Sequence, residues 1–474
     1  MIWSISWKNI WRSKVRSLVV ITSIMLGIFG SVMLIGIMEG WVAQRTHDAI
    51  HKEISHVQIH NPEFLNNEEM KYTLKNYPKV VAEIEKTPGV VAFAPRIKMF
   101  AMAQSDWSTT GLVIEGVDPE KERQVTEISQ SISNGEYFTE DKERLPSIVI
   151  GDKAAESLKL LNYQVTDEKL SKFDSDYYGV KVKQAARSLE GKRFRSEKDF
   201  KKALEEVLTV KDFNRFGKRL ISYFSFYRLH TKITLTLPGI SGQLVTPTFR
   251  LKGIYRTNNT AFDGSTAFVE ADAIKAVTGL GKNDFNEIAI LCTDNNAALP
   301  VAAHLEKVLP ENNVMSWKKM SPELALYSDF MKLMDYIYVA IFLLALSFGI
   351  INTMLMAVLE RTKELGMLMA IGMNKMRVFV MIMLESVFLT LTGGVVGMLV
   401  SGILVHILGK TGIDFSMWAQ GFEAIGFGSV VYPFIPWDTF VGVTILVILT
   451  GILSAIWPAR KALRLNPADA LRTE

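Results

Sequence analysis

Cysteine is nearly absent from the sequence, and so are the short motifs of several enzyme classes. Cys292 is the single cysteine among 474 residues, so an intrachain disulfide framework is excluded and any soluble part must fold on its own core. No His-Glu-x-x-His, Gly-x-Ser-x-Gly or Cys-x-x-Cys string occurs. Because each of these strings carries a defined catalytic chemistry, their absence leads us to predict no catalytic residue in this chain.

A phosphate-binding loop is also missing. The nearest string is Gly279-Leu280-Gly281-Lys282-Asn283, in which Ala276 holds the first glycine position and Asn283 replaces the Ser or Thr that would bind magnesium. We therefore expect no nucleotide hydrolysis and no cofactor bound by this chain.

Charge and histidine give little sign of nucleic-acid or metal binding. The formal net charge is only +4, so we expect no nucleic-acid partner. Of the seven histidines, only His47, His51, His56 and His60 are closely spaced. His47 and His51 could share a helix face, but no acidic or thiol ligand completes a convincing site, and we expect no metal.

Long hydrophobic runs are what the sequence does contain. Hydrophobic residues make up 49% of the chain and charged residues only 22%. The run Leu18–Met38 is charge-free and too long for a signal peptide, and no convincing cleavage site follows it. Its 21 residues, at about 1.5 Å each, are enough to cross a bilayer. We predict four membrane-spanning helices, at residues 18–38, 336–359, 378–408 and 439–457.

Basic residues beside these runs predict the orientation. Short flanks and the second loop are basic, at Lys8, Arg12, Lys14, Arg16, Arg361, Lys363, Lys375, Arg377, Arg460, Lys461, Arg464 and Arg472. Segment 409–438 has Lys410 as its only basic residue. The positive-inside rule then places both termini, loop 360–377 and tail 458–474 in the cytoplasm. Residues 39–335 and 409–438 lie outside.

The first seventeen residues suit a helix lying in the membrane interface. Trp3, Trp7, Ile10 and Trp11 fall at helical spacing on one side, and indole rings favour the depth of lipid headgroups. An ordinary anchoring flank is the alternative, and the two interpretations are compatible. Both imply contact with membrane lipids.

Segment 39–335 changes to short, alternating, β-branched runs separated by helical stretches, so we predict a large α+β domain between the first and second spans. The expected strands are 56–60, 90–104, 110–116, 147–150, 232–237, 248–255, 266–270 and 287–291. The expected helices are 77–86, 152–160, 271–278 and 299–308.

Residues 161–231 differ from the rest of this domain. They contain sixteen basic and ten acidic residues, a surplus of six positive charges, and read as two or three amphipathic helices inserted between a helix and a strand. The insertion could bind a partner or anionic headgroups, or it could be a solvated decoration.

The loop between the second and third spans has an amphipathic pattern. Leu365, Leu368, Met369 and Gly372 fall on one helical face, and a polar end precedes them. Such a helix suits docking into a groove of a soluble partner. Packing at the membrane surface would give the same pattern.

The amino-acid sequence of this loop resembles that of a known family. Asn352-Thr353-Met354…Glu360-Arg361-Thr362-x-Glu364-x-Gly366-x-x-x-Ala370-x-Gly372 is similar to the coupling-helix signature of FtsX-like ABC transporter permeases. The strings Trp7-Lys8-Asn9-Ile10-Trp11-Arg12 and Pro458-Ala459-Arg460-Lys461-Ala462…Asn466-Pro467-Ala468-Asp469-Ala470-Leu471 also look familiar from that family. The resemblance covers both ends and the four-span plan, and the insertion at 161–231 departs from it.

The resemblance implies a permease that works with other subunits. A separate cytoplasmic ATPase dimer, which binds ATP and magnesium, would dock on this chain and on a second permease copy or a related permease in a bacterial inner membrane. The residues that would couple to it are Glu360, Arg361, Glu364, Leu365, Gly366, Leu368, Ala370 and Gly372. ATP-driven movement of this helix would rearrange the outer domains without a substrate channel.

Within the family, His56-Val57-Gln58-Ile59-His60 resembles the branch of lipoprotein-releasing permeases. Release of lipoproteins from the inner membrane, with a periplasmic chaperone as a partner, is therefore the leading expectation. The macrolide-exporter branch, often with a fused ATPase, implies export of small amphiphiles or peptides with a periplasmic adaptor. The cell-division branch, with a shorter outer domain, implies a signalling scaffold for a cell-wall hydrolase.

Two further kinds of residue within the predicted spans are candidate functional or packing residues. Glu385 lies inside the third span, where a carboxylate is costly and should face the bundle or the cytoplasmic edge; a structural hydrogen bond is favoured over proton relay. Small residues predict close helix packing, at Ser23, Gly27, Ser31, Gly393 and Gly397.

Overall fold

The computed structural model describes residues 2–12, 14–139, 144–173 and 178–463, and it divides into two compact units. The helical unit comprises residues 1–45, 323–419 and 428–474. The α/β unit comprises residues 46–322 and 420–427. The predicted tail from Arg464 onward, including the string Asn466–Leu471 and Arg472, lies outside the described residues.

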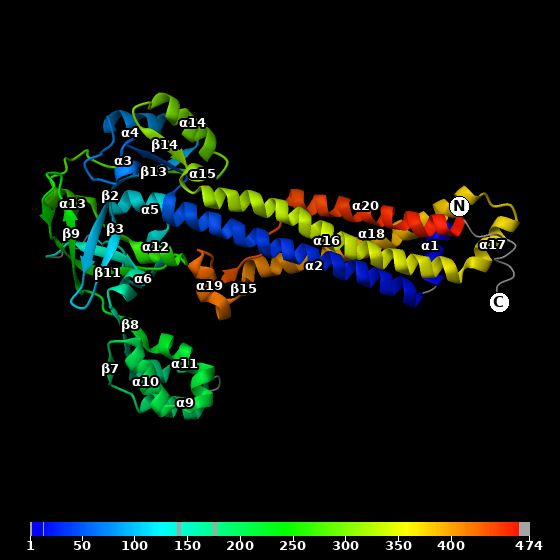
Figure 1. The fold of residues 1–474 in the computed structure, drawn as a ribbon, viewed down its shortest axis with the longest axis horizontal. Helices are drawn as coiled ribbons and strands as arrows, with labels where there is room; N and C mark the ends of the chain where they lie inside the picture. The colour runs from blue at the N-terminus through cyan, green and yellow to red at the C-terminus, as the bar shows by residue number, and fades with distance from the viewer. Residues whose placement is uncertain (1, 13, 140–143, 174–177, 464–474) are drawn as a thin grey trace. The chain divides into compact units, whose positions relative to one another are not determined.

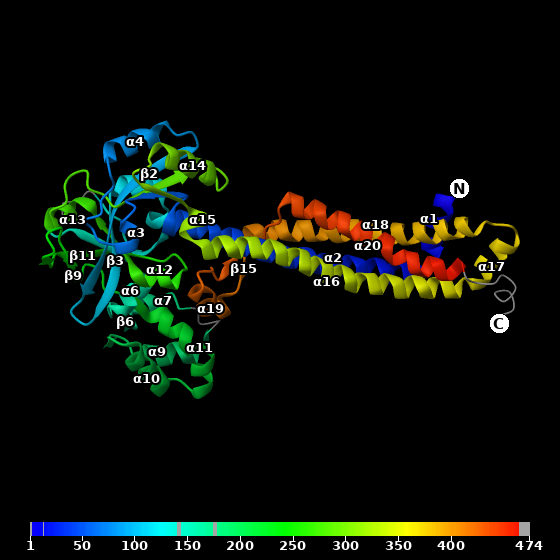
Figure 2. The same cartoon turned by 45° about the horizontal axis from the view of Figure 1, so that its top comes forward.

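Within the described residues, four helices are long and apolar enough to cross a membrane, which confirms the predicted fold class. They are α2 (Lys14–Asp48), α16 (Pro322–Glu360), α18 (Lys375–Thr411) and α20 (Trp437–Leu463), and they run alongside one another in Figures 1 and 2. Two short helices, α1 (Ile2–Arg12) and α17 (Thr362–Ala370), lie at one end of this bundle.

The first two long helices extend past the apolar runs that predicted them. After Met38, α2 continues to Asp48 and is followed by the π-helical turn η1 (Ala49–Ile54). The second begins with Pro322, a residue favoured in the first helical turn because its missing N–H needs no partner there. Helical hydrogen bonds do not require apolar side chains, so hydropathy located the spans but not the helix ends.

Small residues let α18 approach its neighbours closely. A Cβ added at Gly393 would lie 2.9 Å from Ile24 of α2, and one at Gly397 would lie 3.0 Å from the Met25 carbonyl oxygen. On α2, Gly27 faces Leu346 of α16. The buried Ser31 donates its hydroxyl hydrogen bond to the Gly27 carbonyl, 2.8 Å away.

Ser23 does not share this packing role. Its side chain is exposed, and its hydroxyl donates to the Val19 carbonyl within the same helix at 2.8 Å. Within this single chain, the predicted packing of Ser23 against another helix is therefore not seen. A serine can satisfy its hydroxyl within its own helix, so its small size alone did not identify an interface.

A curved sheet forms the centre of the α/β unit. In the described residues it has eleven strands in the order β10-β9-β11-β5-β12-β3-β2-β13-β1-β14, with β4 paired to β11. Because β9 also pairs with β2, the strands from β9 to β2 close into a ring. The strands are β1 (Val57–His60), β2 (Val90–Gln104), β3 (Thr109–Val117), β4 (Ile132–Gly135), β5 (Ser147–Gly151), β9 (Lys232–Pro238), β10 (Leu244–Val245), β11 (Thr248–Tyr255), β12 (Thr266–Glu270), β13 (Glu287–Cys292) and β14 (Asn313–Ser316).

Short helices surround this sheet. In both views α4 and α14 lie together near β14 (Figures 1 and 2), and both bury their apolar faces through Val80, Ile84, Val301 and Leu305. The helices are α3 (Phe64–Asn67), α4 (Tyr77–Lys86), α5 (Pro119–Val125), η2 (Ile128–Ser131), α6 (Asp152–Ser157), α12 (Thr260–Ser265), α13 (Ala271–Thr278), α14 (Ala298–Val308) and α15 (Trp317–Met320).

The insertion at 161–231 has a core and a sheet of its own. Phe200, Leu220 and Phe224 are fully buried among its other apolar residues. Its helices are α7 (Asp167–Ser171), α9 (Val180–Arg187), α10 (Glu197–Val207) and α11 (Val210–Phe224), and its strands are β6 (Leu161–Gln164), β7 (Arg193–Phe194) and β8 (Ser225–Tyr227). The expectation of helices alone was incomplete, because these strands are too short to show an alternating pattern.

The predicted outer loop 409–438 is divided between the units. Strands β15 (Ile413–Asp414) and β16 (Val430–Val431) pair within the helical unit, near η3 (Ser416–Trp418). Residues 420–427, which include most of α19 (Ala419–Ala424), belong to the α/β unit. There the Glu423 carboxylate accepts a hydrogen bond from the Arg256 guanidinium.

Candidate functional site

Helix α17 is set off from both neighbouring helices by local signals. The long helix α16 ends at Glu360, and Arg361 leaves helical geometry before α17 begins. At the other end Gly372 has a φ of +99°, a left-handed conformation that suits glycine. The amides of Gly372 and Met373 donate to the carbonyls of Met369 and Leu368, at 3.1 and 2.9 Å. This Schellman arrangement explains why glycine stands at the end of α17.

The two faces of α17 have different surroundings. Leu365 is buried, and Leu368 and Met369 are partly buried against the apolar core of the helical unit. On the other side Met367 is 52% exposed and Ile371, just beyond the helix, is 79% exposed. The apolar face that the sequence pattern picked out therefore packs within this chain. The surface left for a partner is the one that carries Met367 and Ile371.

A polar network fastens the start of α17 to α18 and α1. The Asn9 side-chain amide donates to Glu385 Oε1 at 2.7 Å, and Arg361 Nη1 lies 3.4 Å from the same oxygen. Arg361 also donates to the Asn9 carbonyl at 3.1 Å. Glu385 thus has both a cation and an amide donor at a buried position. This arrangement matches a structural hydrogen bond near the loop.

A second ion pair joins α1 to α17 closer to the surface. Arg12 Nη2 lies 2.8 Å from Glu364 Oε1, and both side chains are substantially exposed. An exposed pair of this kind contributes about 0–1 kcal/mol. It therefore influences the orientation of α17 more than the stability of the unit.

These groups surround a cavity of about 340 Å³ in the helical unit. Four elements contribute to its wall: α1, α16, α17 and α18. The lining residues are Asn9, Arg12, Met354, Ala357, Val358, Arg361, Glu364, Leu365, Met367, Leu368, Met381, Ile382 and Glu385. The cavity opens to the surface, because Arg12, Glu364 and Met367 in its wall are substantially exposed.

The structure brings five of the predicted residues to this cavity and leaves the others outside it. Arg361, Glu364, Leu365, Leu368 and Glu385 line it. Glu360, Ala370 and Gly372 are exposed, while Gly366 is buried; none of these four lines the cavity.

Sequence reasoning missed the contribution of the N-terminal helix. Asn9 and Arg12 contact Arg361 and Glu364 of the loop from more than three hundred residues away. The string around Asn9 resembles the family sequence, but nothing in it indicates which residue Asn9 contacts. On α1 the three tryptophans are exposed, whereas Ile10 is buried and does not share their surface.

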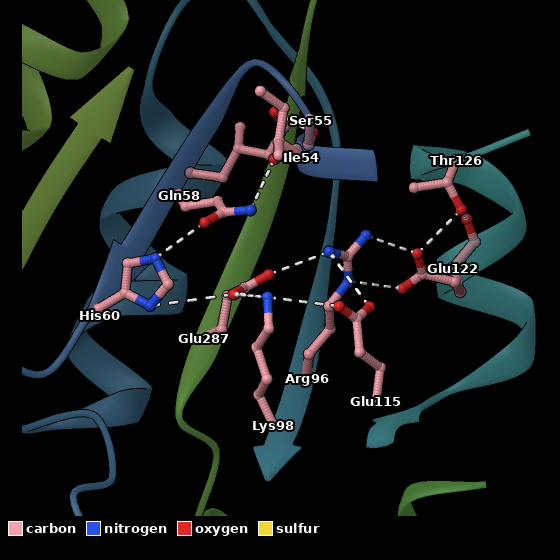
Figure 3. Close-up of polar contacts among 11 residues, drawn as sticks. Ile54, Ser55, Gln58, His60, Arg96, Lys98, Glu115, Glu122, Thr126 and Glu287 are labelled. Atoms are coloured by element: carbon pink, nitrogen blue, oxygen red, sulfur yellow. Dashed lines mark hydrogen bonds and ion pairs between the residues drawn. The ribbon is translucent and has the colours of Figure 1, made fainter. Parts of the chain in front are cut away.

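The α/β unit contains a second polar network (Figure 3), in which Arg96 and the carboxylates of Glu115, Glu122 and Glu287 are buried and Lys98 is partly exposed. The Arg96 guanidinium donates to both carboxylate oxygens of Glu122, at 3.1 and 2.6 Å, and to Glu287 at 2.9 Å. Lys98 lies 3.4 Å from Glu115 and 3.6 Å from Glu287. Strands β2, β3 and β13 and helix α5 are thereby joined through charged side chains.

Electrostatics act differently on two carboxyl groups of this network, because burial raises the pKa of Glu115 whereas Glu287 is kept ionised. Burial by itself would raise the pKa of Glu287, but attraction by Lys98 and Arg96 outweighs it and lowers that pKa to about 2. The network continues along β1, where His60 Nε2 lies 2.9 Å from Gln58 Oε1 and Gln58 donates to the Ile54 carbonyl at 2.7 Å (Figure 3). The π-helical turn η1, which follows α2, is therefore connected through β1 to the middle of the sheet.

Comparisons with known proteins identify two domains in the chain. Residues 336–467 match the family model of the FtsX-like permease C-terminal region, and residues 17–170 match the model of the MacB-like periplasmic core domain.

Individual relatives carry names of the same kind. An uncharacterized ABC transporter permease of Methanocaldococcus jannaschii is 28% identical over 235 residues, covering 48% of this chain and 55% of the relative. The uncharacterized ABC transporter permease YknZ of Bacillus subtilis is 26% identical over 242 residues, covering 50% and 56%. The macrolide export ATP-binding/permease protein MacB of Chlorobium luteolum is 36% identical over 126 residues, covering 27% and 16%. The matched region is thus about half the length of the first two relatives and a smaller part of the third.

Proposed function

We propose that this chain, which combines a MacB-like periplasmic core domain with an FtsX-like permease C-terminal domain, is the membrane subunit of an ABC transporter. In this proposal a separate cytoplasmic ATPase dimer hydrolyses ATP and binds the exposed surface around α17. A second permease, identical or related, completes the assembly. The membrane is a bacterial inner membrane, with both termini on its cytoplasmic side.

The observation that carries the proposal is the way α17 is held. One face packs on the helical core, Arg361 ties its start to Glu385 and Asn9, and Met367 and Ile371 remain exposed. A partner that pushes on the exposed face would therefore move α17 together with the end of α16. A nucleotide state can drive this movement only if the partner binds one arrangement of α17 more tightly than the other.

Chain connectivity gives the movement a route to the outer domain. Helix α16 begins at Pro322, where the α/β unit ends, and α2 leads into the same unit at Thr46. Inside that unit the Arg96 network joins several strands and α5. We infer that the α/β unit responds largely as one body, so that work done at α17 changes how two outer domains are arranged.

The relatives' names favour an exported amphiphile as the cargo. Besides the MacB protein, a pyoverdine export ATP-binding/permease protein of Pseudomonas fluorescens is 33% identical over 139 residues. We infer that this chain moves a small amphiphile or peptide with a periplasmic adaptor. Lipoprotein release, the leading expectation from the sequence, has no specific support among these relatives and stands as the alternative.

The docking surface can be tested by photo-crosslinking in native membranes. A benzophenone amino acid is placed at Met367 or Ile371, with Leu365 on the packed face as the matched control. We expect crosslinks to an ATPase with a phosphate-binding loop from the two exposed positions and none from Leu365. Crosslinks to no ATPase, in membranes where the complex is intact, would contradict the proposal.

Proteins that co-purify with the complex from the same membranes would identify the class of cargo. After gentle purification, mass spectrometry of the co-purifying proteins distinguishes the alternatives. An adaptor supports export, acylated lipoproteins support release, and a cell-wall hydrolase supports a signalling scaffold.

A further inference from the structure

Two histidines and a glutamate meet where α2 passes into η1. His47 and His51 are one turn apart, and their rings stack with centroids 4.2 Å apart. Glu127, from the connection between α5 and η2, places Oε1 3.9 Å from His47 Nε2. One ligand atom from each of the three residues lies within 4.8 Å of the others. All three belong to the α/β unit.

The backbone already holds these residues in register. The Glu127 amide donates to the His51 carbonyl at 2.7 Å, which fixes the connection carrying Glu127 against the turn carrying His51. The turn is π-helical, a rare geometry that is frequently found at functional sites.

The other two histidines of the closely spaced set are engaged elsewhere. His56 Nδ1 accepts from the Cys292 amide at 3.3 Å, and its Nε2 lies 3.0 Å from Asn295 Oδ1. His60 Nε2 lies 2.9 Å from Gln58. His56 and His60 thus have structural hydrogen bonds, whereas His47 and His51 face Glu127, with Asp48 Oδ1 also 4.0 Å from His47 Nδ1. Sequence inspection found no acidic ligand because Glu127 is far away along the chain.

We propose that His47, His51 and Glu127 form a binding site for a divalent transition-metal ion, with Zn²⁺ as the reference ligand. Two imidazole nitrogens and one carboxylate oxygen are a ligand set that zinc accepts, with water at the fourth position. The site is accessible, since the side chain of His47 is 52% exposed and that of Glu127 is 34% exposed. Nitrogen ligands favour Zn²⁺, Cu²⁺ and Ni²⁺ over Mg²⁺ and Ca²⁺.

A bound ion would join the end of the first long helix to the α5–η2 connection. The three ligands come together only in the folded chain, so metal binding stabilises the fold by linkage. The ion would thereby stiffen the place where α2 enters the α/β unit. This inference does not depend on the proposed transport function.

The site is tested by titrating Zn²⁺ into the purified full-length chain, with any affinity tag removed. We expect calorimetry to give one ion per chain and the thermal midpoint to rise until that stoichiometry is reached. His47→Ala, His51→Ala and Glu127→Gln should each weaken binding at least tenfold. His304→Ala, which removes an exposed histidine of α14, should bind like the wild type, and Mg²⁺ should not bind.

A direct measurement of the ligands separates this site from incidental binding. X-ray absorption of the zinc-loaded chain should show two nitrogen ligands at about 2.0–2.1 Å, and the His51→Asn variant should lose one of them. Zinc binding that is unchanged in the His47 and His51 variants would overturn the proposal, as would an absence of binding. Full affinity in Glu127→Gln would overturn the three-ligand site.

Discussion

Removing the carboxylate of Glu385 should destabilise the helical unit, and removing its partner as well should restore it. Glu385→Leu leaves the Arg361 guanidinium and the Asn9 amide without their shared acceptor. Breaking a buried ion pair on one side costs about 3–5 kcal/mol. We expect the lower end, because the side chains of Arg361 and Glu385 are 17% and 12% exposed.

This cost corresponds to a measurable change in thermal midpoint. A change of 1 kcal/mol shifts the midpoint by about 2–4 °C in a domain of 150–250 residues, the size range of the helical unit. Glu385→Leu should therefore lower the midpoint by roughly 6–12 °C. The double variant Arg361→Met with Glu385→Leu replaces the pair by apolar side chains and should regain most of the loss.

Tryptophan fluorescence of the purified protein during heating is a suitable assay, since Trp3 and Trp7 contact Phe388 of α18. Glu364→Leu, which removes a carboxylate from an exposed pair instead, is the matched control and should change the midpoint little. The reasoning is refuted if Glu385→Leu is as stable as this control. It is also refuted if the double variant loses as much as the two single variants added together.

Three other predictions concern the two units separately. Arg96→Met leaves the buried carboxylate of Glu122 without its cation and should destabilise the α/β unit by about 3–5 kcal/mol, seen as faster limited proteolysis of that unit. Unchanged proteolysis would contradict this prediction. Burial raises the pKa of Asp263 to about 7 despite its hydrogen bonds from Thr257. The stabilisation that protonated Asp263 contributes is therefore present below the ordinary carboxyl pKa and is lost as pH rises through 7. The thermal midpoint of Asp263→Asn minus that of the wild type should then increase between pH 4 and 8. A constant difference between the two midpoints would argue against this reasoning. Gly393→Val should force α18 away from α2 and cost about 1–3 kcal/mol in thermal unfolding, while Gly402→Val, where an added Cβ meets nothing within 4 Å, should be tolerated; equal midpoints would show that the contact is not tight.

The sequence predicted eight of the eleven strands described in the large sheet, but not the short strands β4, β10 and β14. The strand at 90–104 and the helices at 77–86 and 271–278 agree with the structure at both ends. Alternation and helical periodicity are local properties, so a single sequence contains them. The fold class followed from these runs.

The contacts between distant segments were not predictable in the same way. Asn9 meets Glu385 across 376 positions, and Arg96 meets Glu287 across 191. A charged residue on a buried strand or in a membrane span predicts that a polar partner lies nearby in the fold. The sequence around that residue does not identify the partner. For the same reason the sequence showed His47 and His51 as a pair without a third ligand.

The central claim is that the exposed side of α17 passes work from an ATPase to the outer domain. The most direct test measures ATP turnover and the distance between two outer domains in the same reconstituted complex, by spin labels on the α/β units. Ile371→Asp should leave the protein folded and the ATPase active but abolish the nucleotide-dependent distance change. Ile240→Asp, the same substitution at an exposed residue of the α/β unit, should behave like the wild type. A distance change that persists in Ile371→Asp would contradict the account.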